Sequence, residues 1–279
     1  MKENSEVDLF RIAIGLVFGV YYAAHFAELN FLFGPNQMID AALLEHFAPS
    51  ILLALPTYFV VYVLYACLLS LIAAFTFGKL GRIGVFALFV CHLSFENANP
   101  LIIHEPQQLM TVALILFLAF LDPRGHAKQD AALVKITLGA LGAYYLAVGI
   151  GKLPDPAWRD GSAVGSLAKW NGIAFQNSLT TAVATHGFIS RLCTWFSLVL
   201  ELSYLPLIFT RFRPALIILV LFFHLCIATC FDLGNISLAM IALNFIALDA
   251  KTRAVYRFWF IRLRNSGASR RRQIYPSMK

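Results

Sequence analysis

Long apolar runs separated by short polar connectors dominate the chain. Eight apolar segments can be drawn, at about 9–33, 51–77, 83–95, 107–122, 133–151, 189–210, 214–231 and 234–249. The runs are continuous and do not alternate in polarity, which argues against a β-barrel. The pattern predicts an all-α, polytopic integral membrane protein, a helical bundle of about eight transmembrane helices. Several segments are shorter than the ~20 residues that cross a bilayer core, which is typical of tilted helices around a cavity.

Composition supports a membrane domain without a second folded unit. Of 279 residues, 59% are hydrophobic and 13% are charged, whereas about a quarter of a soluble domain is charged. We assign residues 1–250 to one transmembrane domain and residues 251–279 to a basic tail. We expect no cleavable signal peptide, because the polar start MKENSEVD precedes an apolar run too long for an h-region. We find no convincing internal repeat.

The positions of Lys and Arg predict the orientation. With the N-terminus inside, all of the 22 Lys and Arg fall on the inner side except Lys152, Arg159, Lys169 and Arg191. By the positive-inside rule, both termini are then cytoplasmic, and we expect a multi-pass protein of the bacterial inner (cell) membrane. The tail carries no acidic residue. We expect it to lie against anionic headgroups of membrane lipids and not to bind nucleic acid, because no aromatic-basic module accompanies it.

Several ionisable residues lie in or near apolar segments, where they are costly. Under the eight-span topology most of them fall in the outer half of the membrane, which predicts one polar pocket open to the outer side. Each alone could also be a hydrogen-bond partner between helices. No HxxxH or HExxH spacing occurs, so we predict no metal site. The residues of the predicted pocket are His25, Glu28, His92, Glu201 and His224.

The stretch GKLPDPAWRDGSAVGSLAKW at 151–170 ends an apolar run on a lysine, Lys152. Gly149 and Gly151 would allow another helix to approach it closely. A lysine acts as a base when its pKa falls from about 10.4 towards neutrality, and burial has that effect. The alternative is a lysine that snorkels to the membrane interface. Trp158 is expected at headgroup level, and Asp160 with the following glycine reads as a turn.

Five stretches together resemble one known family. KLPDPAWRDGSAV resembles the lysine-leucine, acidic, tryptophan, acidic-glycine pattern of the horizontally transferred transmembrane (HTTM) domain family, the transmembrane region of vitamin K-dependent γ-carboxylases. LFRIAIGLVFG is similar to its opening helix, HLSFENANPLIIHEPQQLM to an outer loop, and LVLELSYLPLIF to the helix with a mid-membrane Glu. FHLCIATCFDLGNISLAMIAL resembles its last two helices. The resemblance covers about 9–250.

This resemblance implies a γ-carboxylase-like membrane enzyme, a lyase or quinol oxygenase, that acts on a reduced quinone (vitamin K-like), on a peptide or on both. Lys152 would be the base that deprotonates the quinol, and oxygenation would then give a stronger base. His92, Glu201 and His224 would complete the catalytic set, with His25, Glu28, Asn99, Trp158 and Asp160 as binding residues. The sequence departs from the family at His104-Glu105-Pro106, where Gly-Gly-Asp is common, and carries no large luminal domain.

Two non-enzymatic readings stay open. Some bacterial members of the family are associated with the maturation or export of secreted peptides. A non-catalytic membrane partner of this kind needs the fold but no reactive lysine. A small-molecule transporter is the other reading, although no inverted repeat supports it. For the enzyme, the maturation partner and the transporter alike, we expect membrane lipid around the chain. The enzyme and the maturation partner also imply a peptide or protein substrate on the extracytoplasmic side.

Overall fold

The computed structural model describes residues 6–35, 50–55, 57–98, 105–124, 131–259 and 261. The regular structure in these residues is helical, and their β contact is one isolated bridge between Ala174 and Phe231. Five helices are long and apolar enough to cross a membrane, which indicates an integral membrane protein and agrees with the predicted all-α class. They are α1 (Glu6–Ala24), α5 (Tyr58–Thr76), α8 (Ala131–Lys152), α12 (Gly187–Ile208) and α13 (Arg213–Cys230).

Three further helices fall in the other predicted segments but are shorter. They are α6 (Arg82–Ala98), α7 (Glu105–Ala119) and α14 (Gly234–Asn244), which continues into the 3₁₀ turn η2 (Phe245–Ala247). The first predicted segment, 9–33, is interrupted. Helix α1 ends at Ala24, and the 3₁₀ turn η1 (Phe26–Glu28) and the short helix α2 (Leu29–Phe33) follow it.

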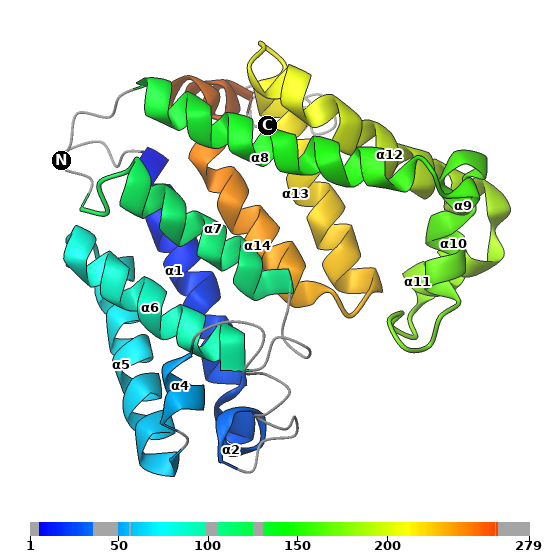
Figure 1. The fold of residues 1–279 in the computed structure, drawn as a ribbon. Coiled ribbons are helices and arrows are strands. Elements are labelled where there is room, and N and C mark those ends of the chain that lie inside the picture. Colours follow the sequence, from blue (N-terminus) through cyan, green and yellow to red (C-terminus); the bar gives the residue numbers. More distant parts are fainter. Residues whose placement is uncertain are drawn as a thin grey trace, which may run out of the picture.

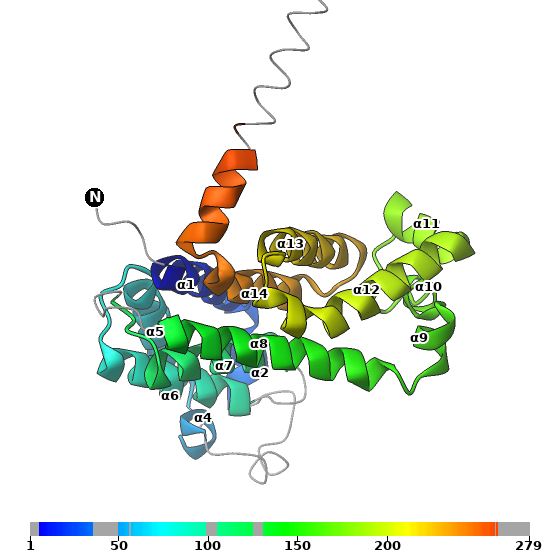
Figure 2. The ribbon, with the colours of Figure 1, turned by 90° about the horizontal axis from the view of Figure 1, so that it is seen from above.

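The helices form two neighbouring groups of four, seen from two sides in Figures 1 and 2. The N-terminal group contains α1, α5, α6 and α7, with the short helix α4 (Ile51–Ala54) against α6. The C-terminal group contains α8, α12, α13 and α14. The two groups meet where α14 packs against α1 and α7. Three short helices lie beyond one end of α8 and α12: α9 (Pro156–Asp160), α10 (Ala163–Ala168) and α11 (Ser178–Thr185).

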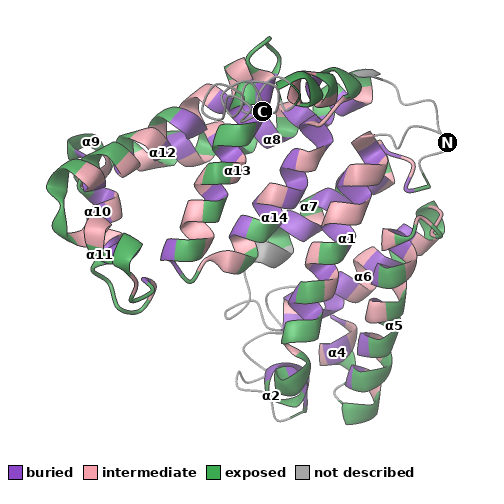
Figure 3. Cartoon of the chain, turned by 180° about the vertical axis from the view of Figure 1, so that it is seen from behind, coloured by how far each residue is buried: buried purple, intermediate pink, exposed green. Residues whose placement is uncertain are grey.

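Burial follows the pattern expected of helices in a bilayer. Figure 3 shows buried residues on the faces that the helices turn towards one another and exposed residues on the outward faces. Many of the exposed side chains are large and apolar, such as Phe59 (77% exposed), Ile83 (88%) and Phe222 (59%). In a soluble protein such a surface would mark an interface or an aggregation site. In a protein that spans a membrane, such an apolar surface faces the hydrocarbon chains of the lipids.

The two groups repeat one order of elements, which corrects the view from the sequence that there is no internal repeat. Each begins with a long helix, α1 or α8, and continues through short helices to a second long helix, α5 or α12. A basic turn at 78–82 or 210–214 leads to the third helix, α6 or α13. The fourth helix, α7 or α14, is short, and a Leu-Asp pair follows it at 121–122 and at 248–249.

One contact recurs at the equivalent place in both groups. The first helix of each carries a Tyr-Tyr pair, and the third carries a buried His. The hydroxyl of Tyr22 lies 2.7 Å from Nδ1 of His92, and the hydroxyl of Tyr145 lies 2.9 Å from Nε2 of His224. The sequence conceals this repeat, because the shared features are short: the Tyr-Tyr pair, the histidine, the basic turn and the Leu-Asp pair.

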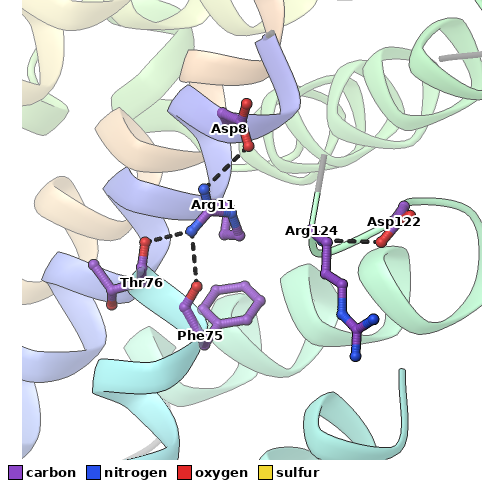
Figure 4. Close-up of polar contacts among 6 residues, drawn as sticks. All are labelled: Asp8, Arg11, Phe75, Thr76, Asp122 and Arg124. Atoms are coloured by element: carbon purple, nitrogen blue, oxygen red, sulfur yellow. Dashed lines mark hydrogen bonds and ion pairs between the residues drawn. The ribbon is translucent and has the colours of Figure 1, made fainter. Parts of the chain in front are cut away.

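A buried arginine joins α1 to the end of α5 in the N-terminal group. The guanidinium of Arg11 donates to the carbonyl of Phe75 at 2.9 Å and to that of Thr76, and it lies 3.0 Å from the carboxylate of Asp8 (Figure 4). These carbonyls belong to the last turn of α5, beyond the reach of its own i+4 amides, and the Phe75 carbonyl also accepts from the amide of Gly78 at 2.9 Å. Gly78 follows with φ of +68°, and a side chain there would meet the guanidinium at 3.0 Å.

Candidate functional site

Lys152 is the last residue of α8, and its ammonium faces α12. The Nζ donates to Oε1 of Glu201 at 2.5 Å and to the hydroxyl of Ser197 at 3.4 Å. The Lys152 side chain is 21% exposed and the Glu201 side chain 5%. The geometry is therefore a largely buried ion pair between two membrane-spanning helices. It differs from a snorkelling lysine, whose ammonium would point into the interface.

Two glycines of α8 allow the helices to come this close. A side chain at Gly149 would meet Leu202 at 3.0 Å and the Cβ of Glu201 at 3.2 Å, and one at Gly142 would meet the Cα of Leu205 at 3.1 Å. Small residues at such spacing are how helices approach one another in membranes. The sequence prediction was correct for Gly149. It was wrong for Gly151, which has no atom within 4 Å of where its Cβ would be.

The loop after α8 folds back over the ammonium. Asp155 caps α9 by accepting from the amide of Ala157, and the ring of Trp158 on α9 lies 4.2 Å from Nζ of Lys152. A cation over an indole face is an attractive contact. Trp158, predicted at the headgroup level, is thus also part of the lysine site.

Asp160 and Gly161 make the turn that the sequence predicts. Gly161 has φ of +86° and ends α9, and a Cβ there would lie 3.1 Å from the Cα of Arg191. The amide of Ser162 donates to the exposed carboxylate of Asp160 at 2.8 Å, and hydrogen bonds from Ser162 lower the pKa of that carboxyl group. Asp160 therefore shapes the loop and does not reach the lysine.

A second tier of polar groups lies deeper between α8, α12, α13 and α14. Tyr145 is seven residues before Lys152, and Tyr204 is three after Glu201, so each lies on the same face of its helix. The two tyrosine rings stack with centroids 4.2 Å apart. Both hydroxyls contact the buried side chain of Asn244, at 3.0 Å for Tyr145 and 2.7 Å for Tyr204.

The hydrogen bonds of this tier define the state of His224. The amide nitrogen of Asn244 donates to the hydroxyl of Tyr145, so the proton of that hydroxyl is free to point at Nε2 of His224. A neutral His224 then carries its ring proton on Nδ1. That Nδ1 and the second carboxylate oxygen of Glu201, Oε2, are both buried and have no hydrogen-bond partner among the described residues. The site thus offers one unpaired donor and one unpaired acceptor.

His92 does not join this site. It lies on α6, which packs against α5, α7 and α4. Its Nε2 lies 2.9 Å from the hydroxyl of Thr111, and that hydroxyl donates to Oε2 of Glu96 at 2.7 Å. With the contact to Tyr22 these groups form a chain of hydrogen bonds inside the N-terminal group. The single pocket expected from the sequence is therefore replaced by two polar networks, because the repeated fold gives each group its own.

The remaining predicted residues lie away from the lysine. His25 follows the end of α1 and donates through Nδ1 to the carbonyl of Tyr21 at 2.8 Å. Glu28 is exposed in η1. The helix breaks at His25, so these two residues do not share a face of one span as expected. Asn99 lies outside the described residues. Of the predicted set, Lys152, Glu201, Trp158 and His224 are brought together by α8, α9, α12 and α13.

Four members of this site were not among the residues predicted from the sequence. They are Tyr145, Ser197, Tyr204 and Asn244. Helical spacing held the signal for three of them, because Ser197 and Tyr204 stand at −4 and +3 from Glu201 on one helix face, and Tyr145 stands two turns from Lys152. Asn244 gave a weaker signal, as a lone amide in an apolar stretch.

Within the described ranges, no three His, Cys, Asp or Glu side chains gather as a metal site would require. Comparison of the chain with protein-family models, with curated proteins and with solved structures found no match. The case for a function therefore depends on the geometry and on the motif resemblance.

Proposed function

We propose that the chain is a membrane-embedded enzyme of the HTTM, γ-carboxylase-like kind, which removes a proton from a reduced quinone with Lys152 as the base. The observation that carries the proposal is the position of the Lys152 amine. It lies in an apolar bundle, 2.5 Å from a carboxylate that is 5% exposed. The lysine also belongs to KLPDPAWRDGSAV, one of the stretches that resemble the family. In this proposal, a lyase or a quinol oxygenase activity of the chain would use the Lys152 site.

The lysine needs a partner that can take its proton before it can act as a base. The carboxylate of Glu201 is placed for this, since a transfer across the 2.5 Å contact leaves a neutral amine and a neutral acid. Burial costs neutral groups less free energy than charged ones, so the apolar surroundings lower the cost of converting the ion pair into the neutral pair. Ser197, within 3.4 Å of both groups, holds the pair in position.

The unpaired groups of the site fit a hydroxyl-bearing ring. A hydroxyl is both a donor and an acceptor, so hydroxyl groups of such a ligand would pair with Oε2 of Glu201 and with Nδ1 of His224, which are two of the buried atoms without a hydrogen-bond partner. Trp158 adds an aromatic face at the outer end. A reduced quinone bound there supplies an acidic hydroxyl. The residues of the chain orient that hydroxyl and receive its proton.

We further propose the full topology: eight spans, both termini cytoplasmic, and a bacterial inner membrane as the location. The connectors at 78–82 and 210–213 and the helix at 250–259 lie at the end of the molecule where α1 begins (Figure 1). Together these three segments carry seven Lys and Arg: Lys79, Arg82, Arg211, Arg213, Lys251, Arg253 and Arg257. Helices α6, α7 and α14 would then cross a thinned or protein-filled part of the bilayer. Single cysteines at Lys169 and Arg211, in a chain without its native cysteines, should react with an impermeant maleimide from opposite sides.

The enzymatic proposal is tested on the purified protein in nanodiscs. A reduced naphthoquinone and oxygen are supplied, and quinone products are measured against the chain-free rate. The Lys152→Ala variant should lose about 10²–10⁴-fold in rate, the usual contribution of a general base. Lys169→Ala is the matched control, because Lys169 is exposed on the loop that follows the same helix. Full activity in Lys152→Ala would end the assignment of Lys152 as the base.

A non-catalytic membrane partner for a secreted peptide is the second candidate. The observation that favours it is that Lys152 already has three partners, Glu201, Ser197 and Trp158. An ammonium has three donors, so the contacts alone explain why a lysine is used here. Acylation of the amine over a range of pH separates the two proposals, with Lys169 as the internal reference. A Lys152 that reacts at neutral pH faster than Lys169 supports the enzyme, and one that stays unreactive until alkaline pH supports the partner.

A further inference from the structure

Asn244 is a buried amide at the end of α14, in a stretch that is otherwise largely apolar. Its nitrogen donates to the carbonyl of Met240 at 2.8 Å and to the hydroxyl of Tyr145 at 3.0 Å. Its oxygen accepts from the hydroxyl of Tyr204 at 2.7 Å. The amide therefore connects α14 with α8 and α12, and both of its N–H groups are in use.

The carbonyl of Met240 decides which way this amide faces. A backbone carbonyl accepts hydrogen bonds and cannot donate them, so the side-chain atom beside it must be the nitrogen of Asn244. The second N–H of that nitrogen then points at the hydroxyl oxygen of Tyr145. A reversed amide would place two acceptors against each other. The backbone of α14 thus determines that Tyr145 meets a donor.

This orientation passes through Tyr145 to the ring of His224. The hydroxyl of Tyr145 accepts from Asn244, so its own proton is directed at Nε2 of His224, 2.9 Å away. A ring nitrogen that accepts carries no proton, and the neutral ring keeps its proton on Nδ1. The three residues are 1%, 3% and 6% exposed for Asn244, Tyr145 and His224. Water therefore does not compete for these hydrogen bonds.

A donor at Nδ1 of His224 suits the chemistry proposed for Lys152. The charge of Lys152 acts on the ring of His224, and Nδ1 is buried without a hydrogen-bond partner among the described residues. In the proposed reaction the O–H bond of the quinol breaks, the proton goes to the amine of Lys152, and the electron pair stays on the oxygen. An N–H group stabilises the negative charge that develops there, whereas an unprotonated nitrogen would repel it.

We infer that Asn244 is a positioning residue, which acts through Tyr145 to hold His224 as a hydrogen-bond donor at Nδ1. The role of that donor, to bind the oxygen that loses its proton, rests on the proposed function. The inference also narrows the substrate class, because the group beside His224 must present an oxygen that accepts a hydrogen bond, as a hydroquinone and its anion do. A histidine held in this way is not the base, which leaves Lys152 in that role.

The tautomer of His224 is the first readout, and it does not depend on activity. The full chain with ¹⁵N- and ¹³C-labelled histidine is measured in lipid bilayers by solid-state NMR, and His224→Gln identifies the signals of His224. The parent chain should carry the proton on Nδ1. Asn244→Asp has nearly the same shape, but its carboxyl group offers at most one proton, for which the Met240 carbonyl is the closer acceptor. Tyr145 should then donate to the carboxyl oxygen and accept from Nε2 of His224, so that the proton moves to Nε2.

Two control variants separate this effect from a general loss of packing. Tyr204→Phe removes a hydrogen bond of the same amide, but the Met240 carbonyl still orients the nitrogen, so the proton should stay on Nδ1. Ser237 lies two turns before Asn244 on α14, and its buried hydroxyl has no hydrogen-bond partner among the described residues. Ser237→Ala should change neither the tautomer nor the turnover. If Asn244→Asp does not fold, Asn244→Leu serves, because Tyr145 can then point either way and both tautomers should appear.

Turnover of the reduced naphthoquinone is the second readout. Asn244→Asp should lower kcat about 10²-fold, the effect of losing one donor to a developing oxygen anion. KM should stay within about threefold, because the lost interaction belongs to the transition state. An Nδ1 proton retained in Asn244→Asp would overturn the positioning role, and a reversed tautomer with unchanged kcat would overturn the role of the donor in the reaction. A parent chain with the Nδ1 proton but without turnover would count against the proposed function alone and would support the positioning of His224 by Asn244.

Discussion

The Nζ of Lys152 lies 2.5 Å from Oε1 of Glu201, and this contact joins the last residue of α8 to α12 in the C-terminal group. Each residue removes the cost that its partner would otherwise carry in an apolar bundle. A buried charge without a partner is strongly destabilising, whereas replacing both charges by apolar groups is often tolerated. The pair therefore has a structural effect that can be measured apart from any catalysis.

Removing one member of the pair should cost more than removing both. Glu201→Leu leaves the ammonium unpaired, and we expect the free energy of unfolding to fall by about 3 kcal/mol, the low end for buried pairs because Lys152 keeps some exposure. Lys152→Met combined with Glu201→Leu should recover most of that loss. Unfolding in mixed detergent micelles measures both, with Lys169→Met as the control. A double variant less stable than Glu201→Leu would contradict a true ion pair.

Gly149 should be far less tolerant of substitution than Gly151, two residues away. A side chain at Gly149 meets Leu202 and Glu201 at 3.0–3.2 Å, and one at Gly151 meets nothing within 4 Å. Gly149→Leu should push α8 from α12, break the lysine contact and cost about 1–3 kcal/mol, as overpacking does. Gly151→Leu is the matched control. Thermal unfolding and the acylation rate of Lys152 report the two effects, and equal behaviour of the two variants would show that α8 and α12 are not held by close packing.

The sequence predicted some parts of the structure and not others, depending on whether the signal was local or came from packing between distant helices. Apolar runs gave the all-α class and the positions of the helices, because burial in lipid imposes a long and simple pattern. The break at His25 was missed, since residues 25–33 remain apolar where the helix does not continue. The link between Lys152 and Glu201 could not be derived, because it depends on how two distant helices pack. The contacts of Asn244 with Tyr145 and Tyr204 could likewise be identified only from the tertiary structure.

Arg11 should be important for folding of the N-terminal group. Its guanidinium binds the last carbonyls of α5 and the carboxylate of Asp8, and the side chain is 7% exposed (Figure 4). Arg11→Gln removes several of these hydrogen bonds, and bonds to charged groups contribute about 1.5–3 kcal/mol each. We expect a fall of about 3 kcal/mol in the free energy of unfolding, measured by chemical denaturation in detergent. Arg82→Gln, at an exposed site on the next helix, should stay within about 0.5 kcal/mol.

The two Tyr-to-His contacts allow the halves of the repeat to be tested against each other. Tyr22→Phe and Tyr145→Phe each remove a buried hydroxyl that contacts a histidine, at 2.7 Å and 2.9 Å. Each should lower the free energy of unfolding by about 1–3 kcal/mol.

The effects of the two variants on quinol turnover should differ, because the hydroxyl of Tyr145 holds His224 in position, and Nδ1 of His224 belongs to the lysine site. His92 is engaged with Thr111 and does not belong to that site. Turnover should therefore fall in Tyr145→Phe and persist in Tyr22→Phe when both are measured well below their unfolding temperatures. Equal loss of turnover in the two variants would mean that both networks serve one activity, and that the assignment of the activity to the C-terminal network alone is wrong.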